Sequence, residues 1–370
     1  MNQKTSKTLI VFIILFLFFT NNSFANKIFY NENNFEAYVY YDYKKMTILL
    51  QTLQFNYSSI MSFESIGKTY EGRNIWMIKL SDNVSSDEEE PGVLLLGAHH
   101  GNEKPSFEVL IYYMSYLVEN YYKENTDNDL DGLLNEDEID GFDNDEDGLV
   151  DEDPSEDRVR SVINNTQIFL IPMVNPDGVE YGKDGSRKNR VPNHGPFGFK
   201  EEVTSYGVNL NRNYGFDWIY YYLFPFNYNL FGNLYDGSFN YRGPRPFSEN
   251  ETKAVKSFIE THEIDISLSY HTYSEIIFYP WYHTSIPNPD EDLFISIGQN
   301  ISKINKYPLL NGKNYIIPRF GGTLGTFENW IYGENRVIAF TIELCKRYAP
   351  TDPAVVLDTC LKNIGVDLYI

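Results

Sequence analysis

The sequence predicts an α/β fold in which helices cover both faces of a largely parallel or mixed sheet. Short apolar segments alternate along the chain with segments of helical periodicity, which is typical of strands linked by helices. Several apolar segments end directly in polar or charged residues, as expected where buried strands end at one edge of an open sheet. The length suits one large α/β domain or two small ones, of which we expect the single domain, and 30 Tyr and 26 Phe residues supply core material.

The expected elements follow in order along the chain. Helices are expected over residues 45–55, 106–122, 249–261 and 291–304, where apolar residues recur at helical spacing. Strands are expected over residues 61–66, 75–80, 93–98, 166–174, 264–269 and 337–344, which are short and mostly apolar. The turn 68–73 joins the first two strands, and the turn Asn175-Pro176-Asp177-Gly178 follows the fourth.

The first 25 residues have the pattern of a secretory leader. Lys4 and Lys7 precede an apolar run over residues 9–19, and small residues at 23 and 25 provide a cleavage site. The run is short for a membrane span, so we expect a signal peptide over residues 1–25, with an uncleaved N-terminal anchor as the alternative. No other apolar stretch reaches membrane length. We therefore expect a mature chain without a membrane span, located outside the cell, in the periplasm or at the cell surface.

The two cysteines, Cys345 and Cys360, both lie near the end of the chain. Outside the cytosol they can form one disulfide that closes a short loop. Two buried free thiols fit the sequence equally well, so both states stay open.

The formal charge of −22 is concentrated in one segment. Residues 124–157 contain 17 Asp or Glu residues and no Lys or Arg, so the rest of the chain carries only −5. A body that is only mildly acidic gives no sign of a nucleic-acid partner.

This acidic insert has the spacing of calcium-binding loops. Its first half places oxygen donors at loop positions 1, 3, 5, 9 and 12 and glycine at position 6, which is the pattern of a twelve-residue calcium loop. Its second half repeats the start of the pattern but has Pro154 at position 12. We expect one or two structural Ca²⁺ ions, with a disordered acidic tract as the alternative. The expected ligands are Asp127, Asp129, Asp131, Leu133, Asn135, Glu138, Asp143, Asp145, Asp147, Leu149 and Asp151.

A possible zinc site begins where the third expected strand ends. His100 and Glu103 stand three residues apart, so an imidazole and a carboxylate can bind one Zn²⁺ from one side and leave other positions open. His271 follows the strand 264–269 and is the best-placed third ligand among the six histidines. Two histidines, one carboxylate and a water are what a catalytic zinc needs.

A carboxylate and two basic clusters accompany these candidate ligands. Glu343 lies in the otherwise apolar strand 337–344, where a charge must be paired or face a functional cavity. Such a desolvated carboxylate suits a general base, while a core ion pair is the alternative. The clusters 187–190 and 211–213 contain arginines, which recognise carboxylates and stabilise oxyanions. Exposed surface arginines are the simpler reading.

In this order the motifs resemble the zinc metallocarboxypeptidases: H-x-x-E after a strand, N-P-D-G, R-K-x-R, L-N-R-N, S-x-H-x-Y and a final strand Glu. The resemblance runs from about residue 38 to 344 and implies a catalytic domain over 38–370 that is interrupted by the acidic insert. It implies a mixed eight-stranded sheet in an α/β fold, and one catalytic zinc held by His100, Glu103 and His271. It also implies that Glu343 is the base, that Arg190 holds the oxyanion, and that Asn211 and Arg212 bind the terminal carboxylate of the substrate.

Further roles follow from the same resemblance. Tyr273, from the S-x-H-x-Y motif, is expected to contact substrate, and Glu328 occupies the position of a side-chain-pocket residue, which suggests basic C-terminal residues. Asn209 replaces the family's usual Asp before L-N-R-N, a change expected to affect how Arg212 is oriented. The substrate-covering Tyr of the family is missing near Phe320, unless Tyr315 replaces it.

The partners expected from this reading are peptides or proteins with a free C-terminus, bound by a monomeric enzyme. Two other functions stay open. One is a hydrolase that uses the same zinc chemistry on cell-wall peptides or on another amide, and the other is a non-catalytic module that binds peptide C-termini.

Overall fold

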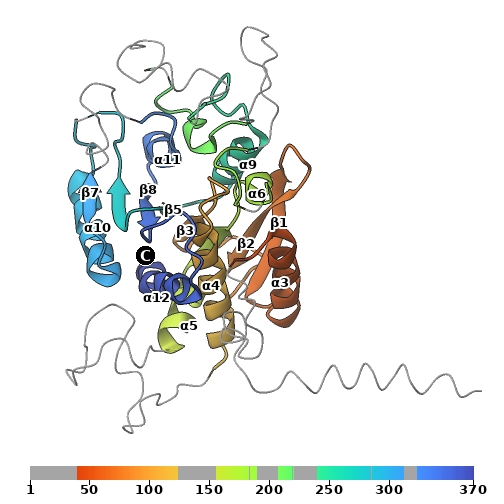
Figure 1. Cartoon of the computed structure of the whole chain (residues 1–370). Coiled ribbons are helices and arrows are strands. Elements are labelled where there is room, and N and C mark those ends of the chain that lie inside the picture. The colour runs from red at the N-terminus through yellow and green to blue at the C-terminus, as the bar shows by residue number, and fades with distance from the viewer. Residues whose placement is uncertain are drawn as a thin grey trace, which may run out of the picture. The chain divides into compact units, whose positions relative to one another are not determined.

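One mixed sheet organises the computed structural model, and its strands lie in the order β1-β2-β4-β3-β5-β8-β6-β7 (Figure 1). The mixed eight-stranded sheet is thereby confirmed for the described part of the chain. Strands β3, β5 and β8 are parallel neighbours at its centre, whereas β1, β2 and β4 pair in antiparallel fashion. The strands are β1 (Met61–Lys68), β2 (Asn74–Leu80), β3 (Gly92–Leu96), β4 (Gln167–Ile171), β5 (Ile266–Thr272), β6 (Ile276–Tyr279), β7 (Leu309–Asn311) and β8 (Ile338–Leu344).

The structure describes residues 40–123, 156–182, 184–189, 207–218, 220, 240–284, 286–311 and 323–370. The described residues from 40 to 370 belong to one compact unit. The expected signal peptide over residues 1–25 and all of the expected calcium ligands lie outside the described residues. In the described part, no helix is long and apolar enough to cross a membrane.

Helices cover both faces of the sheet, as the sequence predicts (Figure 1). Helices α9 and α11 share one apolar core with the strands, built around residues such as Phe258, Trp330 and Leu94. On the other face, Phe294 of α10 packs against Phe340 of β8 with ring centroids 5.4 Å apart, and α4 and α12 pack beside it. The helices are α3 (Tyr43–Asn56), α4 (Pro105–Asn120), α5 (Glu156–Asn165), α6 (Pro176–Val179), α9 (Asn250–Ile259), α10 (Glu291–Asn305), α11 (Phe327–Asn335) and α12 (Pro353–Tyr369), with a short 3-10 turn η1 (Leu210–Arg212).

The central strands are buried along their whole length. Every residue of β3 and β4 is buried, because helices shield both faces of this part of the sheet. The sequences of these two strands therefore contain continuous apolar runs and do not alternate between apolar and polar residues. The carboxyl ends of the parallel strands β3, β5 and β8 meet at one edge, which is where open α/β sheets bind ligands.

Most predicted elements are present, with shifted ends. The strand expected over 264–269 is β5 (Ile266–Thr272), so His271 lies inside the strand rather than after it. The sequence analysis does not predict strands β6 and β7 or helices α5, α11 and α12. The two strands have four and three residues, which are too few to show the alternation of apolar and polar residues that predicts a strand.

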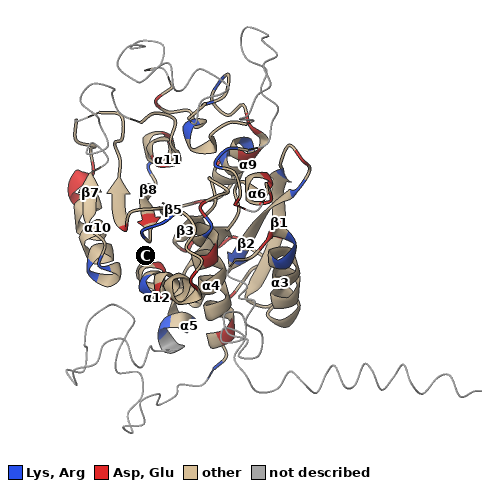
Figure 2. Ribbon diagram, viewed as in Figure 1, with Lys and Arg blue, Asp and Glu red and all other residues tan. Residues whose placement is uncertain are grey.

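Charged residues are spread over the molecule. Figure 2 shows Lys and Arg scattered over several elements, with Asp and Glu between them. Cys345 and Cys360 are both buried and are free thiols in this structure.

Candidate metal centre and active site

Three side chains converge at the carboxyl ends of β3 and β5. Glu103 lies at their centre: its Oε1 is 2.8 Å from His100 Nδ1, and its Oε2 is 2.9 Å from His271 Nδ1. One possible ligand atom from each residue lies within 4.8 Å of the other two, and all three residues are buried. Two imidazole nitrogens and a carboxylate suit Zn²⁺, and three protein ligands leave a coordination position open, as in catalytic sites. The residues present therefore fit the metal that the sequence predicts.

The loop that carries His100 and Glu103 is held by close backbone packing. A Cβ atom added to Gly101 would lie 2.1 Å from the carbonyl carbon of Gly178, so only glycine fits between these residues. Gly178 belongs to the Asn-Pro-Asp-Gly turn, in which Asn175 Oδ1 accepts a hydrogen bond from Gly178 N at 2.9 Å. Asp177 of the same turn binds Arg73 Nη1 at 2.7 Å. The Asn-Pro-Asp-Gly turn thus packs against the loop that carries the candidate metal ligands and supports it.

The ring nitrogens that face away from Glu103 also have partners. His100 Nε2 lies 3.0 Å from Asn209 Oδ1, and Asn209 is completely buried. His271 Nε2 lies 3.2 Å from Ser269 Oγ and 3.3 Å from Asn211 Nδ2. Partners of this kind fix the ring orientation and the tautomer of metal-binding histidines. The Asn209 backbone carbonyl also accepts a hydrogen bond from Arg212 N at 3.0 Å, so Asn209 contacts both His100 and the Arg212 backbone.

The electrostatics of the triad favour an anionic carboxylate. Burial alone would raise the pKa of Glu103, but the charges and hydrogen bonds of His100 and His271 lower it well below its usual value. Burial, with the positive charge of Arg187, lowers the pKa of His100 to about 3. An ionised carboxylate and a neutral imidazole are the forms that bind a metal.

Glu343 adds a second carboxylate to the site. It pairs directly with His271 in the register of β5 and β8, and its Oε2 is enclosed and accepts no hydrogen bond from the described residues. Burial and the nearby charge of Glu103 raise the pKa of Glu343 to about 8. A carboxylate with a raised pKa beside a metal site has the properties of a general base.

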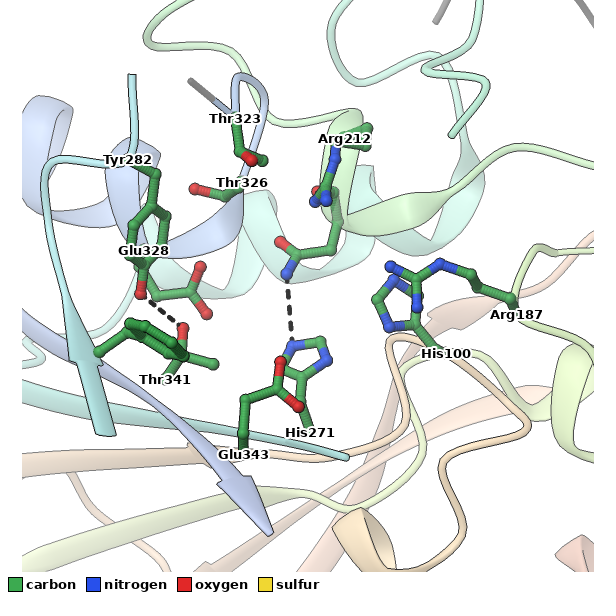
Figure 3. A pocket seen from close by; sticks show the side chains of 12 residues that line it. His100, Arg187, Arg212, His271, Tyr282, Thr323, Thr326, Glu328, Thr341 and Glu343 are labelled. Carbon is green, nitrogen blue, oxygen red and sulfur yellow. Dashed lines mark hydrogen bonds between the residues drawn. The ribbon is translucent and has the colours of Figure 1, made fainter. Parts of the chain in front are cut away.

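A pocket opens beside the triad, and most of the predicted zinc-binding, catalytic and substrate-binding residues in the described part of the chain line it. In Figure 3, Glu343 and His271 lie at the bottom of the view, Arg212 at the top, His100 and Arg187 on one side and Glu328 on the other. The lining residues are His100, Arg187, Asn211, Arg212, His271, Phe278, Tyr282, Thr323, Thr326, Glu328, Thr341 and Glu343.

The Arg212 wall of this pocket is tied to the start of α11. Asn211 Oδ1 accepts a hydrogen bond from Phe327 N at 2.8 Å. Gly325 has a φ of +72°, and a Cβ atom there would lie 2.2 Å from the carbonyl oxygen of Arg212. Only a glycine permits this close approach. The contact holds Thr326 and Glu328 beside Arg212.

Comparison with known proteins agrees with this geometry. The family model described as zinc carboxypeptidase matches residues 46–355. The chain belongs to the zinc carboxypeptidase family. A zinc carboxypeptidase of Saccharothrix mutabilis subsp. capreolus is 25% identical over 348 residues, which cover 90% of this chain and 69% of that protein. Carboxypeptidase B of Astacus astacus is 25% identical over 319 residues, which cover 82% of this chain and 86% of that protein.

Solved structures show the same fold. The carboxypeptidase A of Helicoverpa armigera superposes with a TM-score of 0.68 at 17% identity, covering 94% of this chain and 77% of that one. Thrombin-activatable fibrinolysis inhibitor superposes with a TM-score of 0.66 at 18% identity, covering 89% of this chain and 73% of that one. The chain is therefore a member of a family of zinc-dependent hydrolases with the corresponding fold.

Tyr273, which the sequence predicts to contact substrate, does not line the pocket of this zinc carboxypeptidase fold. Tyr273 is 44% exposed and packs edge-on against Tyr348, with ring centroids 4.7 Å apart, but it is not among the lining residues. Arg190, the expected oxyanion residue, lies outside the described residues, as do Tyr315 and Phe320.

Arg187 is a site residue to which the sequence assigned no role. It lines the pocket, and its Nη1 donates to Glu103 Oε1 at 3.0 Å. The only sequence signal was the motif R-K-x-R, which contains two arginines three positions apart, Arg187 and Arg190. Loop residues have no period that would tell which of the two faces the pocket.

Proposed function

We propose that this protein is a secreted, monomeric carboxypeptidase that hydrolyses the last peptide bond of peptides or proteins with a free C-terminus. The observation that carries the proposal is one pocket that His100 and His271 of the triad line together with Arg212 on the facing wall (Figure 3). Glu103 completes the triad behind them. Arginine binds carboxylates through two parallel hydrogen bonds, so a cation there selects a chain end over an internal peptide bond. Export rests on the leader pattern of residues 1–25.

The proposed mechanism assigns proton transfer to Glu343. His100, Glu103 and His271 would hold Zn²⁺, which when bound lowers the pKa of a water and polarises the scissile carbonyl. Glu343 would accept a proton from the attacking water and then donate it to the leaving amine. Its raised pKa suits both steps, because the carboxylate must take up the proton and also release it.

The oxyanion role is proposed for Arg187. The guanidinium lies beside the metal triad, where charge develops on the carbonyl oxygen during attack. In this structure its Nη1 donates to Glu103 Oε1 at 3.0 Å. Arg190, for which the sequence motif gave the same role, remains the alternative.

The side chain of the terminal residue is proposed to meet Glu328. Glu328 is fully buried and lines the pocket, and neither of its carboxylate oxygens has a hydrogen-bond partner among the described residues. A buried carboxylate without a partner is costly, and a cationic ligand would remove that cost. The hydroxyls of Thr326 and Thr341 lie on the same pocket and offer further acceptors. Substrates ending in Lys or Arg are therefore proposed.

Hydrolysis of blocked dipeptides tests both proposals. Substrates ending in Phe, Leu, Lys and Arg should be cleaved only if their terminal carboxylate is free, and a chelator should abolish cleavage. The preference for Lys and Arg should exceed tenfold in kcat/KM and fall in Glu328→Gln, while cleavage of the Leu substrate persists. No hydrolysis by the zinc-loaded protein would favour the non-catalytic binding module. Cleavage confined to cell-wall peptides would favour the other hydrolase.

Calcium binding by residues 124–157 is a separate proposal, supported by the spacing of their oxygen donors alone. Ca²⁺ should raise the melting temperature and slow proteolysis within this segment, because bound ions would neutralise its mutual repulsion. Asp127→Ala with Asp131→Ala should reduce both effects. A calcium titration that changes neither quantity would contradict the proposal.

A further inference from the structure

A line of buried polar side chains extends from His271 away from the pocket. His271 Nε2 lies 3.2 Å from Ser269 Oγ, which lies 3.5 Å from His99 Nδ1. His99 Nε2 lies 2.9 Å from the Tyr214 hydroxyl. Ser269, His99 and Tyr214 are each completely buried, so solvent does not compete for these hydrogen bonds.

The two groups next to His271 Nε2 are not equivalent. The Asn211 amide nitrogen, at 3.3 Å, is a donor only, and its orientation is set because Asn211 Oδ1 accepts the hydrogen bond from Phe327 N. The Ser269 hydroxyl can both donate and accept. When His271 Nδ1 binds a metal, the ring proton must lie on Nε2, and Ser269 Oγ is then its acceptor.

We propose that Ser269, supported by His99 and Tyr214, is a positioning residue that holds His271 with its proton on Nε2 and with Nδ1 directed at the metal. With the ring proton of His271 on Nε2, the donor and the acceptor of every hydrogen bond in the line are fixed. His271 Nε2–H donates to Ser269 Oγ, Ser269 Oγ–H donates to His99 Nδ1, and His99 Nε2–H donates to the Tyr214 oxygen. A neutral imidazole has one donor and one acceptor nitrogen. With the proton on Nδ1, His99 would donate to Ser269 and accept from Tyr214, which reverses both hydrogen bonds.

Ring packing fixes the same line sterically. The His99 and His271 rings are stacked at 13° with centroids 5.6 Å apart. Tyr214 in turn stacks on Trp330 at 26°, with centroids 5.4 Å apart. Neither His99 nor Tyr214 can leave its partner without displacing an aromatic neighbour. The hydroxyl of Ser269 is therefore held beside His271 by its own strand and by the groups behind it.

Zinc affinity measured without substrate tests this role. The inference rests on the proposed function only for the identity of the metal, so a failure of the positioning role is distinguishable from a failure of peptidase activity. Ser269→Ala removes one oxygen from a buried site, and Ser267→Ala is the matched control. Ser267 is equally buried on the same strand, but its hydroxyl donates to Leu94 O at 2.8 Å.

Competition with a chelator should show zinc affinity about tenfold weaker or worse in Ser269→Ala, and within about twofold of the parent in Ser267→Ala. In the zinc-loaded parent labelled with ¹⁵N-histidine, the Nε2 proton of His271 should exchange slowly with solvent. That signal should weaken or disappear in Ser269→Ala. Equal zinc affinity in the two alanine variants would overturn the proposal.

A second variant tests the far end of the line and keeps the proposal falsifiable if Ser269→Ala does not fold. His99→Phe with Tyr214→Phe keeps an aromatic ring at both positions and removes their polar atoms together, so that Ser269 is the one residue of the line that loses a partner. We expect zinc affinity to fall at least threefold, with the ring proton of His271 exchanging faster. Unchanged affinity and exchange in this folded variant would exclude a supporting role for His99 and Tyr214.

Discussion

Glu343 lies directly opposite His271 in the parallel pairing of β5 and β8. A candidate base and a candidate metal ligand are thus fixed to each other by the backbone ladder of two central strands. Rigid strands hold such groups more precisely than loops do. Because both residues belong to regular structure, their separation does not depend on loop conformation.

Replacing Glu343 should separate chemistry from metal binding. Glu343→Gln keeps the shape of the side chain but cannot take up a proton, so kcat should fall by about 10²–10⁴-fold while zinc affinity stays within about threefold. Steady-state kinetics on a cleaved dipeptide and chelator competition measure the two quantities. Full activity in this variant would exclude Glu343 as the base, and loss of zinc would make it a ligand instead.

The two arginines of the R-K-x-R motif should differ in effect. Arg187→Ala should lower kcat by about 10²–10³-fold with little change in KM, because the oxyanion exists only during the reaction. Arg190→Ala is the matched control and should lower kcat less than tenfold. Zinc content must be measured in both variants, since Arg187 also binds Glu103. A larger loss in Arg190→Ala would return the oxyanion role to that residue.

Asn209 should control zinc affinity through His100. Asn209→Leu removes the acceptor for His100 Nε2, and we expect about tenfold weaker zinc binding. Asn209→Asp offers a charged acceptor, so we expect binding to be tighter, by up to about tenfold. The aspartate should also lower the melting temperature of the metal-free protein, because it buries a charge. Zinc affinities in the reverse order would contradict this role.

The sequence predicts the candidate metal site better than the pocket around it. His100, Glu103 and Glu343 belong to or follow buried strands whose apolar runs are visible in the chain, and a short motif fixes the spacing of the first two. The functions of Arg187 and Asn209 depend on which side chains meet across the fold. Such tertiary contacts carry no periodic signal, so the sequence alone does not show that the Asn209 side chain contacts His100.

The contact between His99 and His271 also cannot be predicted from the sequence, because it depends on the backbone conformation after β3. A strand that continued past residue 98 would direct His99 and His100 to opposite faces, but β3 ends at Leu96 and Ala98 has a φ of +48°. This turn brings His99 beneath His271, where the rings stack. A single residue with positive φ therefore decides which histidines become neighbours, and alanine gives no sequence signal for that conformation.

Glu108 should make the stability of the protein depend on pH. It lies in α4 and is 1% exposed; its Oε1 accepts a hydrogen bond from Tyr41 N, and its Oε2 has no partner in the described part of the chain. Burial raises its pKa to about 8, although the charge of Lys104 opposes the rise. The unfolded chain loses this proton near its ordinary pKa of 4.5, so between about pH 4.5 and 8 the folded state binds more protons. Stability should therefore fall as pH rises through that window.

Glu108→Gln mimics the protonated carboxyl group and should remove this dependence. We expect the variant to match the parent near pH 5 and to exceed its free energy of unfolding by a few kcal/mol near pH 8, on the order set by a shift of several pKa units. Urea unfolding at both pH values measures the difference. Glu64→Gln, on the exposed side of β1, is the control and should follow the parent at both. A constant difference between Glu108→Gln and the parent at the two pH values would mean that Glu108 is already ionised in the folded protein.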